Sequence, residues 1–147
     1  MKYKAKLTSA NVEIYAKLDF LKKYVSELRK FSSCTLTELE KDSKLRGAVE
    51  RYLQLSIEIC LEIGEMLIAN EGFRKATKHR EVIEILGENN VLPKDFSEKF
   101  APAGGLRNIL VHMYDTIDTK KLYKNLKQVN DFDTFAKHIA KYLAKEK

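Results

Sequence analysis

The sequence contains few of the residues that break helices. Of its 147 residues, 2 are proline and 6 are glycine. An all-β fold needs many tight turns, which depend on these two residue types, so their scarcity favours a mainly helical chain. The length suits one domain, spanning residues 1–147, with one sizeable hydrophobic core.

Long apolar runs are also missing. The longest are only a few residues, so no segment is expected to span a bilayer. The basic start MKYKAKLTSA is followed by a polar stretch where a signal peptide would have its apolar core. The two cysteines, Cys34 and Cys60, lack the spacing of a metal site or a redox pair. Together these features predict a cytoplasmic protein with reduced thiols and no membrane partner.

Positive charge predominates over negative charge. There are 27 lysines and arginines against 21 acidic residues, a net charge of +6. Such a surface attracts polyanions such as RNA and makes their binding sensitive to salt. From charge alone, a soluble protein with lysine-rich helix faces remains an alternative.

Apolar residues recur at intervals of four and three, as they do on one face of a helix. The first such segment runs from about Asn11 to Lys30, with the stripe Ile14, Leu18, Leu21, Val25 and Leu28. From Ser43 to about Asn70 the chain carries two stripes side by side, so this segment is expected to be the long central helix of a bundle. Its remaining face is charged and is interpreted as solvated: Arg51, Glu58, Glu62 and Glu65.

Shorter helices are expected in the second half of the chain. One runs from about His79 to Leu86 and is closed by Gly87, which is typical of a helix end. Pro102 and the two glycines after it predict a break in the chain, with a new helix starting at Leu106.

Capping residues indicate where other helices begin. Thr35 and Glu38 form the pattern of a capping box, and Asp118 and Asp131 are suited to start the last two helical segments. The overall prediction is an all-α fold. We expect a compact, up-and-down bundle of about five main helices around the long central one.

The segment Leu106 to Asp118 separates polar from apolar side chains. On a helix at about 100° per residue, one side carries Arg107, Asn108, His112, Tyr114, Asp115 and Asp118. The apolar arc comprises Leu106, Ile109, Leu110, Met113 and Ile117. The histidine is therefore expected to be reachable from solvent.

An arginine and a histidine on one exposed face suit phosphodiester chemistry. Histidine exchanges protons near neutral pH, and the planar guanidinium of arginine matches phosphate oxygens. In RNA cleavage the 2'-hydroxyl loses a proton while negative charge grows on the phosphoryl oxygens, and no metal ion or cofactor is required in principle. From residue types alone, an ordinary hydrogen-bonded surface or interface remains open.

The stretch RNILVHMY, residues 107–114, has the spacing Arg-x4-His-x-Tyr. Together with the long helix RYLQLSIEICLEIGEMLI and the ending LYKNLKQVNDFDTFAKHIAKYL, it resembles the HepT-type ribonuclease toxins of the HEPN-domain family over most of residues 10–145. The resemblance implies a two-fold homodimer with both motifs facing a shared cleft. It also implies a cognate antitoxin with a nucleotidyltransferase fold.

The same resemblance implies roles for individual residues. It implies a metal-independent endoribonuclease acting on RNA, with Arg107 and His112 as the catalytic pair and Asn108 as their polar neighbour. Tyr114 matches the tyrosine to which the antitoxin can transfer AMP. One motif histidine per chain can act as a base, and our hypothesis is that a second His112 across the two-fold axis supplies the acid.

The basic stretch FRKATKHR, residues 73–80, contains Lys75 and Lys78, which are candidates for contacting RNA. The alternative is a solvated loop in which His79 needs no function, and His138 is interpreted as a helix-surface residue. Two other functions remain open for the whole chain. One is a non-catalytic HEPN domain that binds nucleotides or is the partner subunit of a nucleotidyltransferase, and the other is a plain helical dimerisation protein.

Overall fold

The computed structural model describes residues 8–112 and 117–145, in which all regular structure is helical. The helices are α1 (Ser9–Lys30), α2 (Leu36–Lys41), α3 (Ser43–Glu71), α4 (His79–Glu88), α5 (Lys94–Phe100), α6 (Pro102–His112), α7 (Thr119–Lys127) and α8 (Asn130–Lys145). Five of them, α1, α3, α4, α6 and α8, have ten or more residues. The expected all-α bundle of about five main helices is confirmed.

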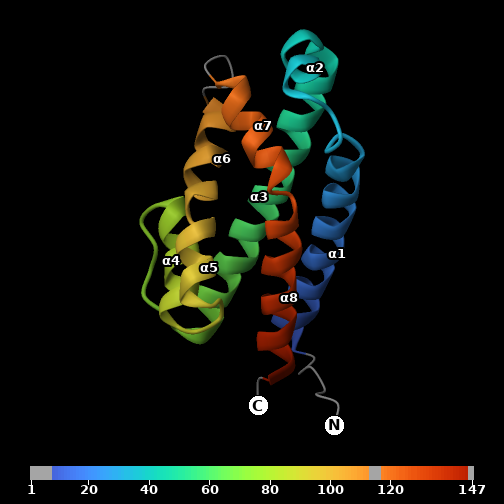
Figure 1. Ribbon diagram of the computed structural model, residues 1–147. Coiled ribbons are helices and arrows are strands. Elements are labelled where there is room, and N and C mark those ends of the chain that lie inside the picture. Colours follow the sequence, from blue (N-terminus) through green and yellow to red (C-terminus); the bar gives the residue numbers. More distant parts are fainter. Residues whose placement is uncertain (1–7, 113–116, 146–147) are drawn as a thin grey trace.

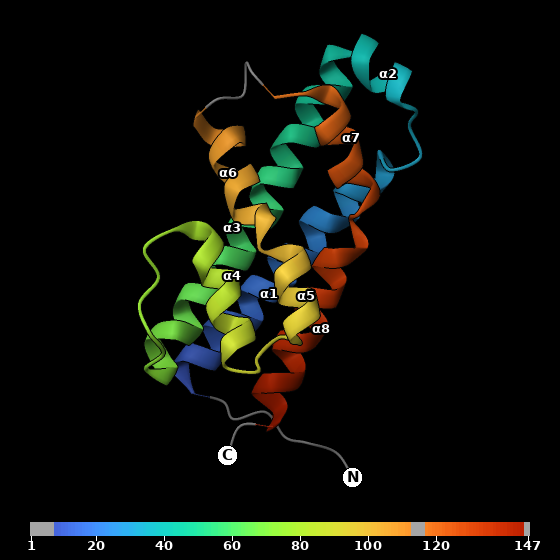
Figure 2. The ribbon, with the colours of Figure 1, turned by 60° about the vertical axis from the view of Figure 1, so that its left-hand side comes forward.

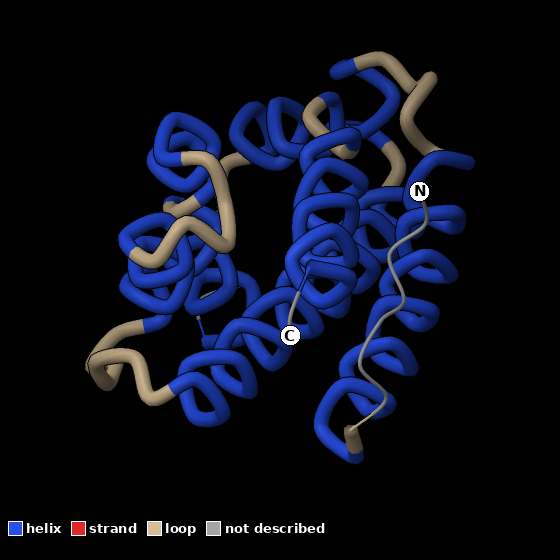
Figure 3. Tube along the Cα trace, turned by 90° about the horizontal axis from the view of Figure 1, so that it is seen from below, coloured by secondary structure: helices blue, strands red, loops and turns tan. Residues whose placement is uncertain are grey.

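The helices run up and down around α3, which is the longest (Figure 1). In Figure 1, α1 and α8 lie on one side of α3, and α4, α5 and α6 lie on the other. Helices α1 and α6 run upward in this view, whereas α3 and α8 run downward. The view from below in Figure 3 shows helices joined by loops throughout the described chain, and none of those helices has the length and apolar character needed to cross a membrane.

Large apolar side chains hold the side formed by α1, α3 and α8. The expected stripe of α1 is buried at Ile14, Leu21, Val25 and Leu28, and Leu18 is half-buried. It belongs to the same hydrophobic core as the buried residues of α3 and α8, among them Val49, Ile63, Phe135 and Ile139. The four-and-three spacing was therefore sufficient to predict this half of the core.

Helix ends follow the local chemistry of the sequence. The capping box at Thr35 and Glu38 is present, because each residue's side chain accepts a hydrogen bond from the other's backbone N–H. Asp118 caps α7 as expected. The start of α8 was misplaced by two residues: Asp131 was expected to cap the helix, but α8 begins at Asn130, and Asp131 lies in its first turn.

On the other side of α3, two glycines mark close contacts between helices. The expectation that Gly87 closes a helix was wrong: α4 runs on to Glu88, and Gly87 lies within it. A Cβ atom on Gly87 would lie 2.1 Å from the Oγ of Ser97 on α5, and one on Gly64 of α3 would lie 2.5 Å from a methyl group of Val82 on α4. The missing side chains of these two glycines therefore allow α4 to pack closely against α3 and α5.

The break expected before Leu106 is also corrected. Helix α6 begins at Pro102 and contains both Gly104 and Gly105. Proline suits the first turn of a helix because its φ angle is already helical and its missing N–H would have no partner there. A Cβ atom on Gly104 would lie 2.6 to 2.9 Å from backbone atoms of the residue pair 79–80. This glycine therefore lets α6 approach the start of α4.

Candidate active site

Arg107 on α6 is held by a carboxylate from the long helix α3. Its Nη2 atom lies 3.2 Å from Oε2 of Glu58, and the two side chains are 23% and 25% exposed. The burial of Leu106 and Leu110 on the opposite side of α6 turns Arg107 toward this position. The guanidinium is thus fixed in place but remains open to solvent.

Asn108 continues this set of contacts toward α4. Its Oδ1 atom lies 3.4 Å from Nη1 of Arg107 and 2.9 Å from Nδ1 of His79, the first residue of α4. Glu58, Arg107, Asn108 and His79 therefore form one connected group from three helices. We refer to these four residues as the arginine cluster.

The course of the chain after α3 explains why His79 reaches α6. Helix α3 ends at Gly72, whose left-handed φ of 68° suits glycine, and the following segment returns along the bundle before α4 begins (Figure 2). The start of α4 then lies beside Gly104 of α6. Residues 79 and 108 are 29 positions apart in sequence and meet across this contact.

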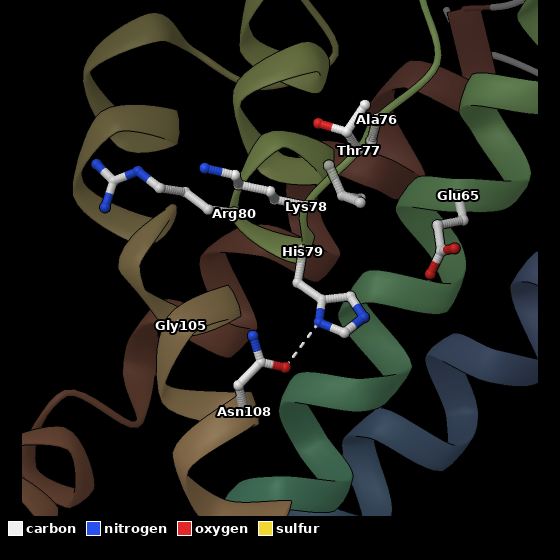
Figure 4. A pocket seen from close by; sticks show the side chains of 9 residues that line it. Glu65, Ala76, Thr77, Lys78, His79, Arg80, Gly105 and Asn108 are labelled. Atoms are coloured by element: carbon white, nitrogen blue, oxygen red, sulfur yellow. Dashed lines mark hydrogen bonds between the residues drawn. The ribbon is translucent and has the colours of Figure 1, made fainter. Parts of the chain in front are cut away.

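A surface hollow of about 520 Å³ adjoins the arginine cluster. Figure 4 shows His79 and Asn108 joined by their hydrogen bond in the lining of this hollow. Its lining combines these two with further polar and charged side chains, including Glu65, Thr77, Lys78 and Arg80. Of the two lysines predicted to contact RNA, Lys78 lies next to the cluster, whereas Lys75 lines a separate, more apolar hollow with Phe73 and Ile68.

His112 is exposed, as expected, and is the last residue of α6. It is five positions after Arg107 in sequence, which corresponds to about 140° around the helix and about 7.5 Å along it. Among the described residues, no hydrogen bond joins the His112 ring to the arginine cluster. The structure thus brings Arg107 and Asn108 together and places His112 further along the same helix.

Two further residues were expected near this group. Asp118, placed beside Arg107 by the helical projection, is instead the N-cap of α7, where its backbone is extended. Tyr114 lies outside the residues that the structure describes. The projection therefore holds over the described residues of α6 and fails at Asp118.

Glu58 and His79 were not identified from the sequence. Glu58 was interpreted as part of a solvated face, and His79 as a loop residue without function. Glu62, on the same face, forms an ion pair with Lys17 of α1 at 2.8 Å. The glutamates therefore share a sequence pattern, but their partners come from distant helices, and no local signal distinguishes them.

Other reactive side chains lie away from the cluster. Both cysteines are buried, and burial raises the pKa of the Cys34 thiol and, more strongly, that of the Cys60 thiol. Such thiols are poor nucleophiles. Within residues 8–112 and 117–145, no group of three or more His, Cys, Asp or Glu side chains is arranged to hold a metal ion.

His138 on α8 differs from its sequence interpretation. It was expected on the helix surface, but it is half-buried, and its ring lies 5.9 Å from that of Phe96. Burial, aided by the charges of Lys137 and Lys141, lowers the pKa of His138 below its usual value of 6.5. It belongs to the packing between α5 and α8 and not to the site.

The helical fold has counterparts among solved structures. The chain superposes on a tri-AMPylated HEPN toxin of Shewanella oneidensis, solved in complex with an MNT antitoxin, with a TM-score of 0.78 and 22% identity over 87% of this chain and 96% of that one. This similarity shows that the two chains share one helical-bundle fold.

Residues 21–139 match the family described as HepT-like ribonucleases, and the chain therefore belongs to that family. It is 26% identical over 133 residues to a tRNA nuclease HepT of Aphanizomenon flos-aquae, covering 90% of each chain. It is also 26% identical over 82 residues to an mRNA nuclease HepT of Shewanella oneidensis, covering 56% of this chain and 62% of that one. The family and the ribonuclease class expected from the sequence are both confirmed.

Proposed function

We propose that this ribonuclease is the toxin of a toxin–antitoxin pair and cleaves RNA internally without a metal ion, using Arg107 and His112. The observation that carries the proposal is the state of Arg107, which is anchored by Glu58 yet open to solvent on the helix that exposes His112. The nuclease names of the relatives from Aphanizomenon flos-aquae and Shewanella oneidensis support an RNA substrate.

The chemistry follows from these residue types. The guanidinium of Arg107 binds the phosphoryl oxygens and stabilises the negative charge that grows on them. His112 takes the proton of the ribose 2'-hydroxyl as its oxygen attacks phosphorus. The bond from phosphorus to the 5'-oxygen then breaks, and an acid protonates that oxygen. The products are a 2',3'-cyclic phosphate and a 5'-hydroxyl end.

The position of His112 on α6 favours a site shared by two copies of the chain. Because His112 lies about 140° around the helix and about 7.5 Å along it from Arg107, one copy holds the two groups well apart on their shared polar side. A two-fold axis beside α6 would bring both motifs to one cleft. The second copy's His112 would then supply the acid that one chain lacks.

The surroundings of the arginine cluster support RNA binding along α4. Lys78 lines the hollow beside His79 and Asn108, where it would neutralise a neighbouring phosphate. Lys75 lies at the adjoining hollow and would contact RNA further from the scissile bond.

The proposed antitoxin is a nucleotidyltransferase-fold protein that transfers AMP to Tyr114. The comparison with a tri-AMPylated HEPN toxin bound to an MNT antitoxin supports this partner and this modification. Because Tyr114 is two residues from His112 in sequence, an attached AMP would bring negative charge close to the catalytic histidine. That charge would compete with the RNA phosphate.

Cleavage of a fluorescent single-stranded RNA by the purified chain in EDTA tests the activity. We expect cleavage with 2',3'-cyclic phosphate ends, a loss of about 100- to 10,000-fold for His112→Ala and of about 100- to 1,000-fold for Arg107→Ala. An active His112→Ala enzyme would contradict the proposal. A chain that binds nucleotides but leaves RNA intact would instead be the non-catalytic alternative.

Shared catalysis has its own test. Heterodimers of one wild-type and one His112→Ala subunit, isolated with two different tags, are expected to lose most of the wild-type activity because the acid is missing. Heterodimers that keep half or more of that activity would show that each copy works alone.

A growth assay tests the toxin role. Expression of the wild-type chain is expected to arrest growth, and co-expression of the proposed nucleotidyltransferase-fold antitoxin should restore it. Arrest that persists equally in the Arg107→Ala variant would separate toxicity from RNA cleavage.

A further inference from the structure

The side-chain oxygen of Asn108 has two neighbours, and together they determine how the amide is turned. Nη1 of Arg107 lies 3.4 Å from it, and Nδ1 of His79 lies 2.9 Å from it. A guanidinium can only donate hydrogen bonds, so the amide must direct its oxygen, and not its nitrogen, toward Arg107. The same oxygen can only accept, and Nδ1 of His79 must therefore carry a proton.

This arrangement leaves the Asn108 nitrogen unpaired with either neighbour and free to donate. In Figure 4 that nitrogen points away from His79, on the side of the hollow where Lys78 and Arg80 are drawn. An amide N–H in this place, beside the guanidinium of Arg107, is suited to bind an oxygen of the RNA phosphate.

We propose that His79 is a positioning residue: its Nδ1–H holds the Asn108 oxygen, so that the Asn108 nitrogen faces the substrate. The role rests on the proposed ribonuclease function. His79 itself does not touch the reacting atoms. It acts through Asn108, which in its absence could rotate and direct its oxygen at the phosphate, where two acceptors would repel each other.

The backbone around His79 is rigid enough for this task. His79 is the first residue of α4, and its carbonyl carbon lies 2.7 Å from the place where a Cβ atom on Gly104 would be. The side chain is half-buried, which restricts its rotation. Because the two helices touch here, a donor at position 79 is held at a fixed distance from the Asn108 oxygen.

The first experiment measures the protonation of the ring without reference to activity. Long-range ¹H–¹⁵N spectra of the full chain, recorded at a pH where the ring is neutral, should show His79 protonated on Nδ1. In Asn108→Leu, which has no acceptor, the ring should change to the Nε2–H form that free imidazole side chains favour. A wild-type ring protonated on Nε2 would overturn the proposal.

The second experiment compares replacements that differ only in where they place a donor. The amide nitrogen of asparagine matches Nδ1 of histidine in distance from the backbone, whereas that of glutamine matches Nε2. On the RNA substrate, we expect His79→Asn to keep most of the kcat, and His79→Gln and His79→Ala to lower kcat by about 10- to 100-fold with little change in KM.

A double-mutant cycle separates positioning from a merely structural role. If His79 acts through Asn108, the double variant His79→Ala/Asn108→Ala should be no slower than Asn108→Ala alone. If the fold-loss of kcat in the double variant equals the product of the losses in the two single variants, the proposal is overturned. His138→Gln, a histidine replacement on α8 outside the site, is the matched control and should retain wild-type kcat.

The outcomes distinguish this inference from the function on which it rests. A wild-type chain that cleaves no RNA would remove the ribonuclease proposal, and with it the role of His79, whatever the ring's protonation. A wild-type chain that cleaves RNA while His79→Ala is equally fast would overturn the positioning role alone.

Discussion

The two sides of the long helix α3 are packed in different ways. On the side of α1 and α8, large apolar side chains such as Leu21, Phe135 and Ile139 are buried between helices. On the side of α4 and α6, the contacts depend on glycines at positions 64, 87 and 104, where added side-chain atoms would collide with a neighbour. The first kind of packing supplies stability, because it removes much apolar surface from water. The second fixes the distance between backbones.

The arginine cluster lies on the side of α3 where α4 and α6 pack. Glu58 belongs to α3, Arg107 and Asn108 belong to α6, and His79 starts α4. The site therefore depends on the exact separation of α4 and α6 more than on the volume of the core beneath α1. Substitutions on the side of α1 and α8 should therefore lower stability more than activity, and substitutions on the side of α4 and α6 should lower activity more than stability.

The largest expected loss of stability comes from Phe135→Ala on α8. Phe135 is fully buried, so its removal leaves a cavity and should lower the free energy of unfolding by about 3 to 5 kcal/mol. Urea unfolding measures this loss, and Lys137→Ala, an exposed position on the same helix, should stay within about 0.5 kcal/mol of wild type. The folded fraction of Phe135→Ala should keep its kcat. A lower kcat in that fraction would show that the site also depends on this side.

Gly104→Ala should lower kcat strongly and stability only moderately, the opposite of Phe135→Ala. Its Cβ would lie 2.6 Å from the backbone nitrogen of Arg80, which cannot move independently of α4, so we expect a loss of about 1 to 3 kcal/mol in stability. Moving α6 away from His79 should lower kcat by about 100-fold. The matched control is Gly105→Ala, which has open space and should gain about 0.5 to 1 kcal/mol through helix propensity. Equal kcat in both variants would contradict the comparison.

Glu58→Gln tests the cluster with little change in stability. The ion pair with Arg107 is about a quarter exposed, so its loss should lower the free energy of unfolding by less than about 1 kcal/mol. A neutral amide would hold the guanidinium less firmly, and kcat should fall by about 10-fold. Glu62→Gln, which removes the ion pair with Lys17 on the same helix, should leave kcat unchanged. A similar kcat for both variants would remove the role of Glu58.

The smallest effect concerns pH and His138. Burial lowers the pKa of His138 in the folded chain below 6.5, so the unfolded chain binds a proton more readily. Its contribution to stability is therefore complete above about pH 6.5 and is lost as the pH falls toward the folded-state pKa. His138→Gln should flatten the fall in stability over this interval, as measured by urea unfolding at several pH values. If the free energy of unfolding of His138→Gln falls with pH as steeply as that of wild type, other groups cause the fall.

The sequence predicted one side of the fold better than the other. Periodic leucines and isoleucines identified α1 and α3, because burial of one face leaves a regular pattern. The same reasoning misplaced Gly87 and the start of α6, since a glycine in a tight contact looks like a helix end when its partner helix is unknown. Pro102 was interpreted as a break, although it occupies the first turn where proline is well tolerated.

The site was predictable only where its residues are neighbours in sequence. Arg107, Asn108 and His112 follow one another on α6, so the motif and the helical projection identified them. Glu58 and His79 come from other helices, and their roles depend on how α3 and α4 pack against α6. The sequence around Glu58 and His79 shows only a charged helix face and a basic stretch, so it does not indicate that either residue has a partner on α6.

The close approach at Gly104 gives a rule for comparing related chains. A protein that retains Arg107 and His112 but has a bulky residue at position 104 would keep the visible motif and lose the register in which Asn108 meets His79. Under the roles proposed above for Asn108 and His79, such a chain would carry the motif and yet be a weak nuclease. Under this proposal, a glycine three positions before the arginine indicates which related chains can be efficient nucleases.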